Sequence, residues 1–184
     1  ETIVKEKVEQ KMDVSQPLYT IGIKDVIPQE ETKVKKHIAI EILLNIIMGK
    51  SSKLYKTLYD KAIIYGGVSL DYEFSKKYAH ILITGQSKNP EEVYKMFKNT
   101  IKELKQNGVS QEDFERNKKM IYGSYVKEYN DVADIARMFL ADYFKGINSF
   151  DYLEQIQAVN VEYLNQLLKD VFKEEKMILS IVKN

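Results

Sequence analysis

The fold is decided at a junction between two expected helices, which reads Gly49-Lys50-Ser51-Ser52-Lys53-Leu54-Tyr55-Lys56-Thr57-Leu58-Tyr59-Asp60-Lys61. Glycine is typical of the residue that ends a helix, so Gly49 indicates the stop of the first one. Serine is a common N-terminal cap, so Ser51 or Ser52 indicates the start of the second. The stretch therefore predicts a helix, a short turn of small residues, and another helix that runs to about Lys61.

The first helix is expected over residues Glu30 to Met48. Apolar side chains recur every four residues there, and Ala39, Leu43 and Ile47 widen the stripe that starts with Val34 and Ile38. This period is that of a helix with one apolar face. Leu54 and Leu58 supply the inward face of the helix that follows the turn.

On either side of the junction, the pattern predicts four strands and five more helices. The strands are expected at Leu18–Lys24, Gly66–Phe74, Tyr78–Gln86 and Lys176–Val182. Helices are expected from Pro90 to Asn107, from Ser110 onward, and at Val132–Phe144, Phe150–Gln157 and Val161–Phe172. This order predicts an α+β fold, in which an antiparallel or mixed sheet has its helices packed on one face.

The expected domain organisation is simple. Residues 1–16 are mixed in charge and weakly patterned, so we expect an extended connector with room for one strand. Residues 17–184 are expected to form one domain, with the best internal boundary near residues 107–109. The chain starts at Glu1 without a methionine, which favours a piece of a longer protein.

Composition excludes several classes of function. The 184 residues carry 28 Lys and Arg against 27 Asp and Glu, a net charge of +1, so no overall field attracts nucleic acid or an anionic membrane. There is no cysteine, which removes disulfides, thiol catalysis and cysteine-bound zinc. No apolar run reaches the roughly 18 to 20 residues of a membrane helix. We expect neither a nucleic-acid nor a membrane partner, and a cytoplasmic location.

Catalytic and metal motifs are also missing. Gly49-Lys50-Ser51 resembles the end of a phosphate-binding loop, but that motif needs glycine where Leu44 stands and must follow a strand. Neither H-E-x-x-H nor the inverted H-x-x-E-H occurs, and no serine lies in a G-x-S-x-G elbow. We therefore expect no catalytic residue and no metal site in this chain.

The two histidines have ordinary interpretations. His37 and Glu41 are four residues apart and share a helix face, so a shared ion is geometrically allowed. A zinc site needs three or more protein ligands, and a surface hydrogen-bonded pair is the preferred interpretation. His80 lies in an expected strand and is interpreted as half-buried packing. The 13 tyrosines are interpreted mostly as amphipathic packing at the edge of a core.

From Leu18 to Lys183 the order of elements resembles the C-terminal half of zinc peptidases of the insulinase/pitrilysin family. Three local matches carry the resemblance: residues 18–24 before an apolar helix, residues 51–61, and residues 114–120 followed by Asn130 and Ala136. The likeness is strongest to processing-peptidase-type zinc proteases of Gram-positive bacteria.

The resemblance implies one half of a two-half clamshell that closes over a peptide chamber. In this family the N-terminal half carries H-x-x-E-H and zinc, so zinc is implied for a missing N-terminal half and no cofactor for this chain. The implied partners are that half, a peptide substrate, and a homodimer or heterodimer with a related chain. The function expected from the resemblance is a non-catalytic, substrate-enclosing domain of a zinc metalloendopeptidase that acts on peptides or unfolded segments.

The family also places an arginine and a tyrosine about seven residues apart to hold substrate. Here the arginine position is Tyr59, and the next tyrosine is Tyr65, six residues on. The resemblance thus gives Tyr59 and Tyr65 as candidate substrate-binding residues, with core-edge packing as the simpler interpretation. Two alternatives stay open for the chain, a non-catalytic assembly subunit of the same fold and an unrelated α+β binding module.

Overall fold

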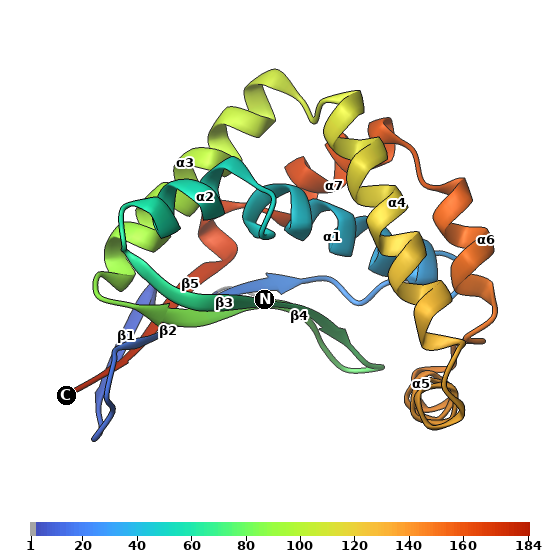
Figure 1. Cartoon of the computed structure of the whole chain (residues 1–184), viewed down its shortest axis with the longest axis horizontal. Helices are drawn as coiled ribbons and strands as arrows, with labels where there is room; N and C mark the ends of the chain where they lie inside the picture. Colours follow the sequence, from blue (N-terminus) through green and yellow to red (C-terminus); the bar gives the residue numbers. More distant parts are fainter. Residues whose placement is uncertain (1–2) are drawn as a thin grey trace.

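The computed structural model describes residues 3–184, which form a five-stranded sheet with most helices stacked on one face (Figure 1). The strands are β1 (Lys7–Lys11), β2 (Leu18–Asp25), β3 (Ile64–Phe74), β4 (Ala79–Ser87) and β5 (Met177–Lys183). The helices are α1 (Lys33–Met48), α2 (Lys53–Asp60), α3 (Pro90–Asn107), α4 (Gln111–Glu128), α5 (Val132–Lys145), α6 (Asp151–Ala158) and α7 (Val161–Val171), and a single 3₁₀ turn (Glu174–Lys176) precedes β5.

The sheet is mixed, and its strand order is β1-β5-β2-β4-β3. β1 runs parallel to β5, whereas all the other neighbours are antiparallel. Side chains alternate between faces, so Ile21, Ile83 and Leu179 are buried under the helices while Thr20 and Thr84 face the other way. The predicted α+β fold with helices on one face is confirmed, and β1 and β3 are the two edge strands.

Helix α1 lies at the centre of the molecule. It contacts β3 on one side and α2, α3, α4, α6 and α7 around the rest of its circumference. The predicted one-sided apolar stripe is therefore too narrow, because Ile40, Leu44 and Met48 outside it are also buried. A helix with apolar side chains around most of its circumference is covered on most sides, and α1 accordingly forms a layer between the sheet and the outer helices.

A buried ion pair fixes the start of α1 to the sheet. Lys36 and Asp25 at the end of β2 are both buried, and their charged atoms are 2.7 Å apart. Lys36 Nζ also donates to the carbonyl of Val26, and Tyr72 Oη of β3 donates to Asp25 at 2.9 Å. Every polar atom of the pair is thus provided with a partner, which is the condition under which buried charges are tolerated.

The junction of residues 49–61 forms the predicted helix–turn–helix, with two refinements. Ser52, and not Ser51, is the cap of α2, because its hydroxyl accepts from Tyr55 N at 3.1 Å. Gly49 has an ordinary φ of −66°. Glycine is needed there because a Cβ would lie 2.5 Å from the Asn45 carbonyl oxygen.

The other predicted elements are confirmed with small shifts at their ends. Helix α1 begins at Lys33 and not Glu30, because residues 29–32 form a turn in which Thr32 N donates to Gln29 O. Strand β3 begins at Ile64, two residues before the predicted start. The domain prediction, a connector over residues 1–16 and a domain over 17–184 with a boundary near 107–109, stays a prediction; residues 1–2 lie outside the described part of the chain.

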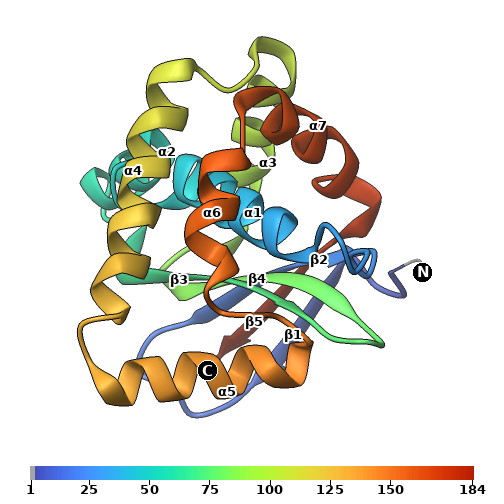
Figure 2. The ribbon, with the colours of Figure 1, turned by 90° about the vertical axis from the view of Figure 1, so that its right-hand side faces the viewer.

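Helix α5 differs from the other helices in position. It stands apart from the helical layer, toward the open face of the sheet, beyond the hairpin of β3 and β4 (Figures 1 and 2). Asp142 is the one α5 residue whose side chain is buried, with Met138 partly buried against the core. The end of α5 is held by Lys145, whose Nζ pairs with Glu73 of β3 at 3.2 Å and whose carbonyl accepts from Lys33 at 3.1 Å.

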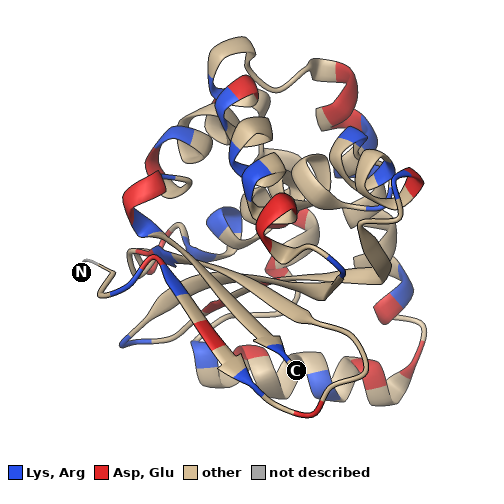
Figure 3. Ribbon diagram, turned by 90° about the vertical axis from the view of Figure 1, so that its left-hand side faces the viewer, with Lys and Arg blue, Asp and Glu red and all other residues tan. Residues whose placement is uncertain are grey.

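Charged residues of both signs are interspersed over the surface, as Figure 3 shows for one side of the molecule. This distribution agrees with the nearly balanced charge of the sequence. In the described part of the chain, residues 3–184, no helix has both the length and the apolar character required to cross a membrane.

Replacing Gly85 by alanine is expected to destabilise the fold. A Cβ at residue 85 in β4 would lie 2.7 Å from the hydroxyl oxygen of Tyr19, a side chain that is fully buried. Overpacking of this kind costs about 1–3 kcal/mol, and chemical denaturation of Gly85→Ala measures it. The matched control is Gly123→Ala on exposed α4, where a Cβ meets nothing within 4 Å and should add up to about 1 kcal/mol of stability. Equal stabilities of the two variants would contradict this account of Gly85.

Candidate functional site

The two predicted substrate-binding tyrosines are exposed and lie near the same end of the sheet. Tyr59 on α2 is 57% exposed and stacks on Tyr55, with ring centroids 6.1 Å apart. Tyr65 is 37% exposed at the start of β3. Tyr55 connects them, because its hydroxyl donates to the carbonyl of Gly66 at 3.0 Å. Their role in binding peptide stays a prediction.

The edge strand β3 is irregular just after Tyr65. Tyr65 pairs with Gln86 and Ser69 with Thr84, so residues 66–68 lie opposite the single residue Gly85 of β4. Gly66 takes a φ of +70°, which glycine adopts without strain. A bulge of this kind bends an edge strand and changes where its backbone groups point. The sequence pair Gly66-Gly67 is the signal that identifies it, and sequence reasoning missed its meaning.

A row of small hydroxyl side chains crosses the open face of the sheet. Ser69 of β3 pairs with Thr84 of β4, Thr84 pairs with Thr20 of β2, and Thr20 pairs with Ser180 of β5. The hydroxyl oxygens of Thr20 and Thr84 are 3.3 Å apart. The row begins at the irregular edge and carries no charge, so it offers hydrogen bonds that do not depend on the charge of a ligand. Sequence analysis did not single out these residues.

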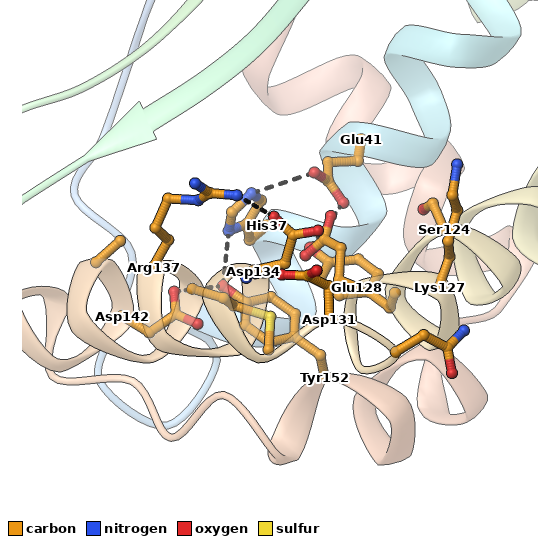
Figure 4. A pocket seen from close by; sticks show the side chains of 14 residues that line it. His37, Glu41, Ser124, Lys127, Glu128, Asp131, Asp134, Arg137, Asp142 and Tyr152 are labelled. Atoms are coloured by element: carbon orange, nitrogen blue, oxygen red, sulfur yellow. Dashed lines mark hydrogen bonds and ion pairs between the residues drawn. The ribbon is translucent and has the colours of Figure 1, made fainter.

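An open cavity of about 900 Å³ is lined by residues of α1, α4, α5 and α6 (Figure 4). Its wall holds a chain of hydrogen-bonded side chains. Tyr152 Oη donates to Asp142 at 3.1 Å and lies 3.3 Å from His37 Nδ1. His37 Nε2 is 3.5 Å from Glu41, which also accepts from Tyr125 Oη at 3.1 Å. Burial raises the pKa of the Tyr125 and Tyr152 hydroxyls, so both stay protonated donors.

The predicted surface pair of His37 and Glu41 needs a correction. The His37 side chain is only 13% exposed, because edge contacts with Tyr72, Phe74 and Tyr152 enclose its ring. The pair is thus part of the cavity wall. His80, by contrast, is half-buried in β4 and stacks on Tyr78, as the sequence indicated.

The cavity is acidic. Its lining includes five carboxylates against two bases, Lys127 and Arg137, and the five are Glu41, Glu128, Asp131, Asp134 and Asp142. Desolvation, and then the charges of Glu41, Asp134 and Asp142, raise the pKa of Glu128 above its ordinary value. Within residues 3–184 these side chains do not come together as a metal site, since no three His, Asp or Glu residues are placed to share an ion.

Comparison with known proteins gives a consistent result. The family model described as the peptidase M16 inactive domain matches residues 2–121. The zinc protease YmfH of Bacillus subtilis is 22% identical over 179 residues, which is 96% of this chain and 42% of YmfH. The chain thus spans less than half the length of this relative.

Two solved structures show how widely the fold is shared. An M16-like peptidase from Alicyclobacillus acidocaldarius matches with a TM-score of 0.92 at 22% identity, over 99% of this chain and 44% of that one. The inactive peptidase domain of a zinc protease from Bordetella parapertussis matches with a TM-score of 0.76 at 12% identity, over 95% of this chain and 94% of that one. A unit of this size has therefore been crystallised both within a longer chain and nearly by itself.

Replacing Asp142 by alanine is expected to release α5. The carboxylate accepts from Tyr152 and, at 2.8 Å, from Ser149, and both donors are almost completely buried. Removing the acceptor of the Ser149 hydroxyl, and one of the two partners of the Tyr152 hydroxyl, costs about 1–3 kcal/mol, and hydrogen exchange should show faster amide exchange along α5. The control is Asp134→Ala, which breaks an exposed ion pair with Arg137 and should cost about 0–1 kcal/mol. Unchanged amide exchange along α5 in Asp142→Ala would contradict the role of Asp142 in holding this helix against the domain.

Replacing Glu128 by glutamine is expected to stabilise the protein at neutral pH. The pKa of this carboxyl is raised on folding, so the folded state favours the protonated form and loses stability as pH rises past the unfolded value, roughly 4.3. Glu128→Gln should therefore gain stability at pH 7 and lose that gain below about pH 4. Thermal melts of wild type and variant at both pH values measure it. A gain that does not depend on pH, or an equal gain in Glu115→Gln on the same helix, would contradict this explanation.

Proposed function

The chain belongs to the family of peptidase M16 inactive domains, and from this premise we propose that it is the non-catalytic half of a zinc metallopeptidase, enclosing the peptide that the other half cleaves. The chain spans 42% of YmfH and 44% of the Alicyclobacillus peptidase, so the proposal needs a second half of comparable size. The two halves would close as a clamshell, with the open face of this sheet as one wall of the chamber.

The observation that carries the proposal is the uncovered edge of β3 next to exposed tyrosines and the hydroxyl row. An edge strand has unpaired N–H and C=O groups, and an extended peptide binds such groups as an added strand whatever its sequence. Tyr59 and Tyr65 lie beside that edge, with apolar rings and polar hydroxyls for side chains of the peptide. The hydroxyls from Ser69 to Ser180 extend the polar surface across the open face.

The zinc and the reacting groups are assigned to the other half. The described residues provide no set of three metal ligands, and the sequence holds neither zinc-binding motif of these peptidases. When bound in its own half, zinc supplies a Lewis acid and an activated water for peptide hydrolysis. The residues of this chain contribute binding, orientation and exclusion of solvent. Because catalysis and binding are assigned to different halves, this chain would work with the catalytic half on one polypeptide or as a dimer with a related chain.

A second candidate function is a non-catalytic assembly subunit on the same fold. Tyr59 favours it, because it stands where the family resemblance places a substrate-holding arginine, and tyrosine cannot provide that charge. The H-x-x-E-H motif distinguishes the two. An intact motif in the partner half supports the peptidase, whereas a degraded motif supports the assembly role.

Replacing Tyr59 and Tyr65 together by alanine is expected to weaken peptide binding about tenfold. The change removes two exposed rings from the edge of the proposed chamber, where each contributes roughly 0.5–1.5 kcal/mol through contact with a peptide. Fluorescence anisotropy with a labelled, unfolded peptide measures the affinity of the isolated chain. The matched control is Tyr122→Ala on α4, which is 39% exposed against 37% for Tyr65.

Two results would contradict the proposed function. One is an unchanged affinity in the double variant, or an equal loss in Tyr122→Ala, which would remove the tyrosines from the binding surface. The other is hydrolysis of the peptide by the isolated chain, after metal removal and reloading with zinc, at the rate of a complete peptidase. The proposal predicts binding without cleavage.

A further inference from the structure

Helix α5 presents an unusually apolar surface to solvent. Five of its large apolar side chains are more than half exposed: Val132, Phe139, Leu140, Tyr143 and Phe144. Phe144 reaches 75% exposure, whereas the buried member of the helix is the charged residue Asp142. A surface helix in a soluble domain normally has the opposite arrangement, with its apolar face inward and its charged face outward. We call these five residues, with Ala133 and Ala136 between them, the α5 arc.

The α5 arc is continuous and uncharged. At 100° per residue, Phe139, Val132 and Tyr143 are within about 40° of one another, and Leu140 and Phe144 extend the same side to about 140°. The charged residues Asp134, Asp142 and Lys145 occupy the remainder of the circumference, and Arg137 borders the arc. Clustered apolar side chains of this extent on one face mark an interaction surface, because isolated exposed apolar residues are common but contiguous ones are not.

We propose that the α5 arc is the surface on which the catalytic half docks. This inference rests on the proposed function and assigns it a contact surface. YmfH and the Alicyclobacillus peptidase are more than twice as long as this chain, so each holds a further body of comparable size beside this fold. Helix α5 stands toward the open face of the sheet, and a second half that closes over that face reaches α5 before the helical layer (Figures 1 and 2).

The chemistry of the arc favours a folded partner over a peptide. An extended peptide needs hydrogen-bond partners for its backbone, and the backbone groups of a helix are already paired within it. The arc offers only aromatic and aliphatic side chains, which is the composition of the buried centre of a permanent interface. The edge of β3 and the hydroxyl row supply the hydrogen bonds that a peptide needs, so the two ligands have separate surfaces.

The contacts that hold α5 against the domain suit such a docking surface. Asp142 fixes the helix through Tyr152 and Ser149, and Lys145 fixes its end through Glu73 and Lys33. These contacts all use the side of α5 that faces the domain, so they hold the arc outward. The helix is thus positioned with its apolar side presented before the partner arrives, which reduces the ordering cost of binding.

Hydroxyl-radical footprinting tests the proposal directly. The isolated 184-residue chain is compared with the intact protein that contains the catalytic half. We expect the labelling rates of Phe139, Tyr143 and Phe144 to fall at least fivefold in the intact protein. Tyr78, at the tip of the β3–β4 hairpin, is the internal reference, because it is 51% exposed, as Phe139 is. Its rate should change less than twofold.

Two substitutions provide a second test of the docking surface. Phe139→Glu places a charge in the arc and should restore the labelling of Tyr143 and Phe144 in the intact protein to within twofold of the isolated chain. Tyr78→Glu should leave them protected. Because Phe139 is exposed, neither substitution removes a buried side chain, and a thermal melt of the isolated chain verifies that both variants fold.

Three results would overturn the docking surface. Equal labelling of the arc in the isolated chain and the intact protein shows that the catalytic half does not cover it. Protection that develops only when peptide is added identifies the peptide as the occupant. Protection in the isolated chain that grows with protein concentration identifies a second copy. None of these results alters the peptide affinities of the Tyr59 and Tyr65 variants, so the failure of this inference is separable from the failure of the proposed function.

Discussion

The burial of α1 on most of its sides is the constraint on which the rest of the structure depends. A 16-residue helix with apolar side chains around most of its circumference is stable in water only when other elements surround it. The sheet covers one side of α1, and α2, α3, α4, α6 and α7 cover the others. The helices are thereby collected on one face of the sheet, and the opposite face is left open. The buried pair of Lys36 and Asp25 fixes the rotation of the central helix relative to that sheet.

This asymmetry also separates the proposed binding surfaces from the core. Strand side chains that point toward the helices, such as Ile21, Ile83 and Leu179, are large and buried, whereas Thr20, Thr84 and Ser180 point away with their hydroxyl groups. The edge strand β3 provides free backbone groups at the margin of the open face. Helix α5 lies outside the helical layer, toward that face (Figure 1), with Asp142 buried on its inner side and its aromatic side chains exposed on the outer side. In the proposed peptidase, this half would thus offer the β3 edge and the hydroxyl row to the peptide, and the apolar α5 arc to its partner.

Much of the fold could be predicted from the sequence because local signals agreed with the global arrangement. The period of four in α1, Asn89-Pro90 before α3 and Ser110 before α4 each fixed an element to within about three residues. The central position of α1 was not predicted, because the stripe that starts with Val34 and Ile38, even when widened by Ala39, Leu43 and Ile47, leaves out the apolar side chains on the rest of the circumference. The start of α1 was misplaced because the turn at residues 29–32 is stabilised by backbone hydrogen bonds, which leave no periodic pattern.

The candidate site was less predictable. The tyrosines were found through the family resemblance, but the bulge at Gly66 and the hydroxyl row arise from strand register, which single residues do not reveal. The acidic cavity collects residues from four helices across more than a hundred positions of sequence, and no spacing rule joins them. His37 was predicted to lie at the surface because the aromatic rings that cover it come from β3 and α6.

The central claim is that this chain holds an extended peptide on the edge of β3 without cleaving it. Backbone NMR of the isotope-labelled chain, titrated with an unfolded peptide, tests it most directly. The account predicts chemical-shift changes at Tyr59, at residues 65–69 and along Thr84, Thr20 and Ser180, with new amide protection in β3 and none in the outer helices. Shift changes confined to the cavity of α4, α5 and α6, or no binding at millimolar peptide, would contradict it.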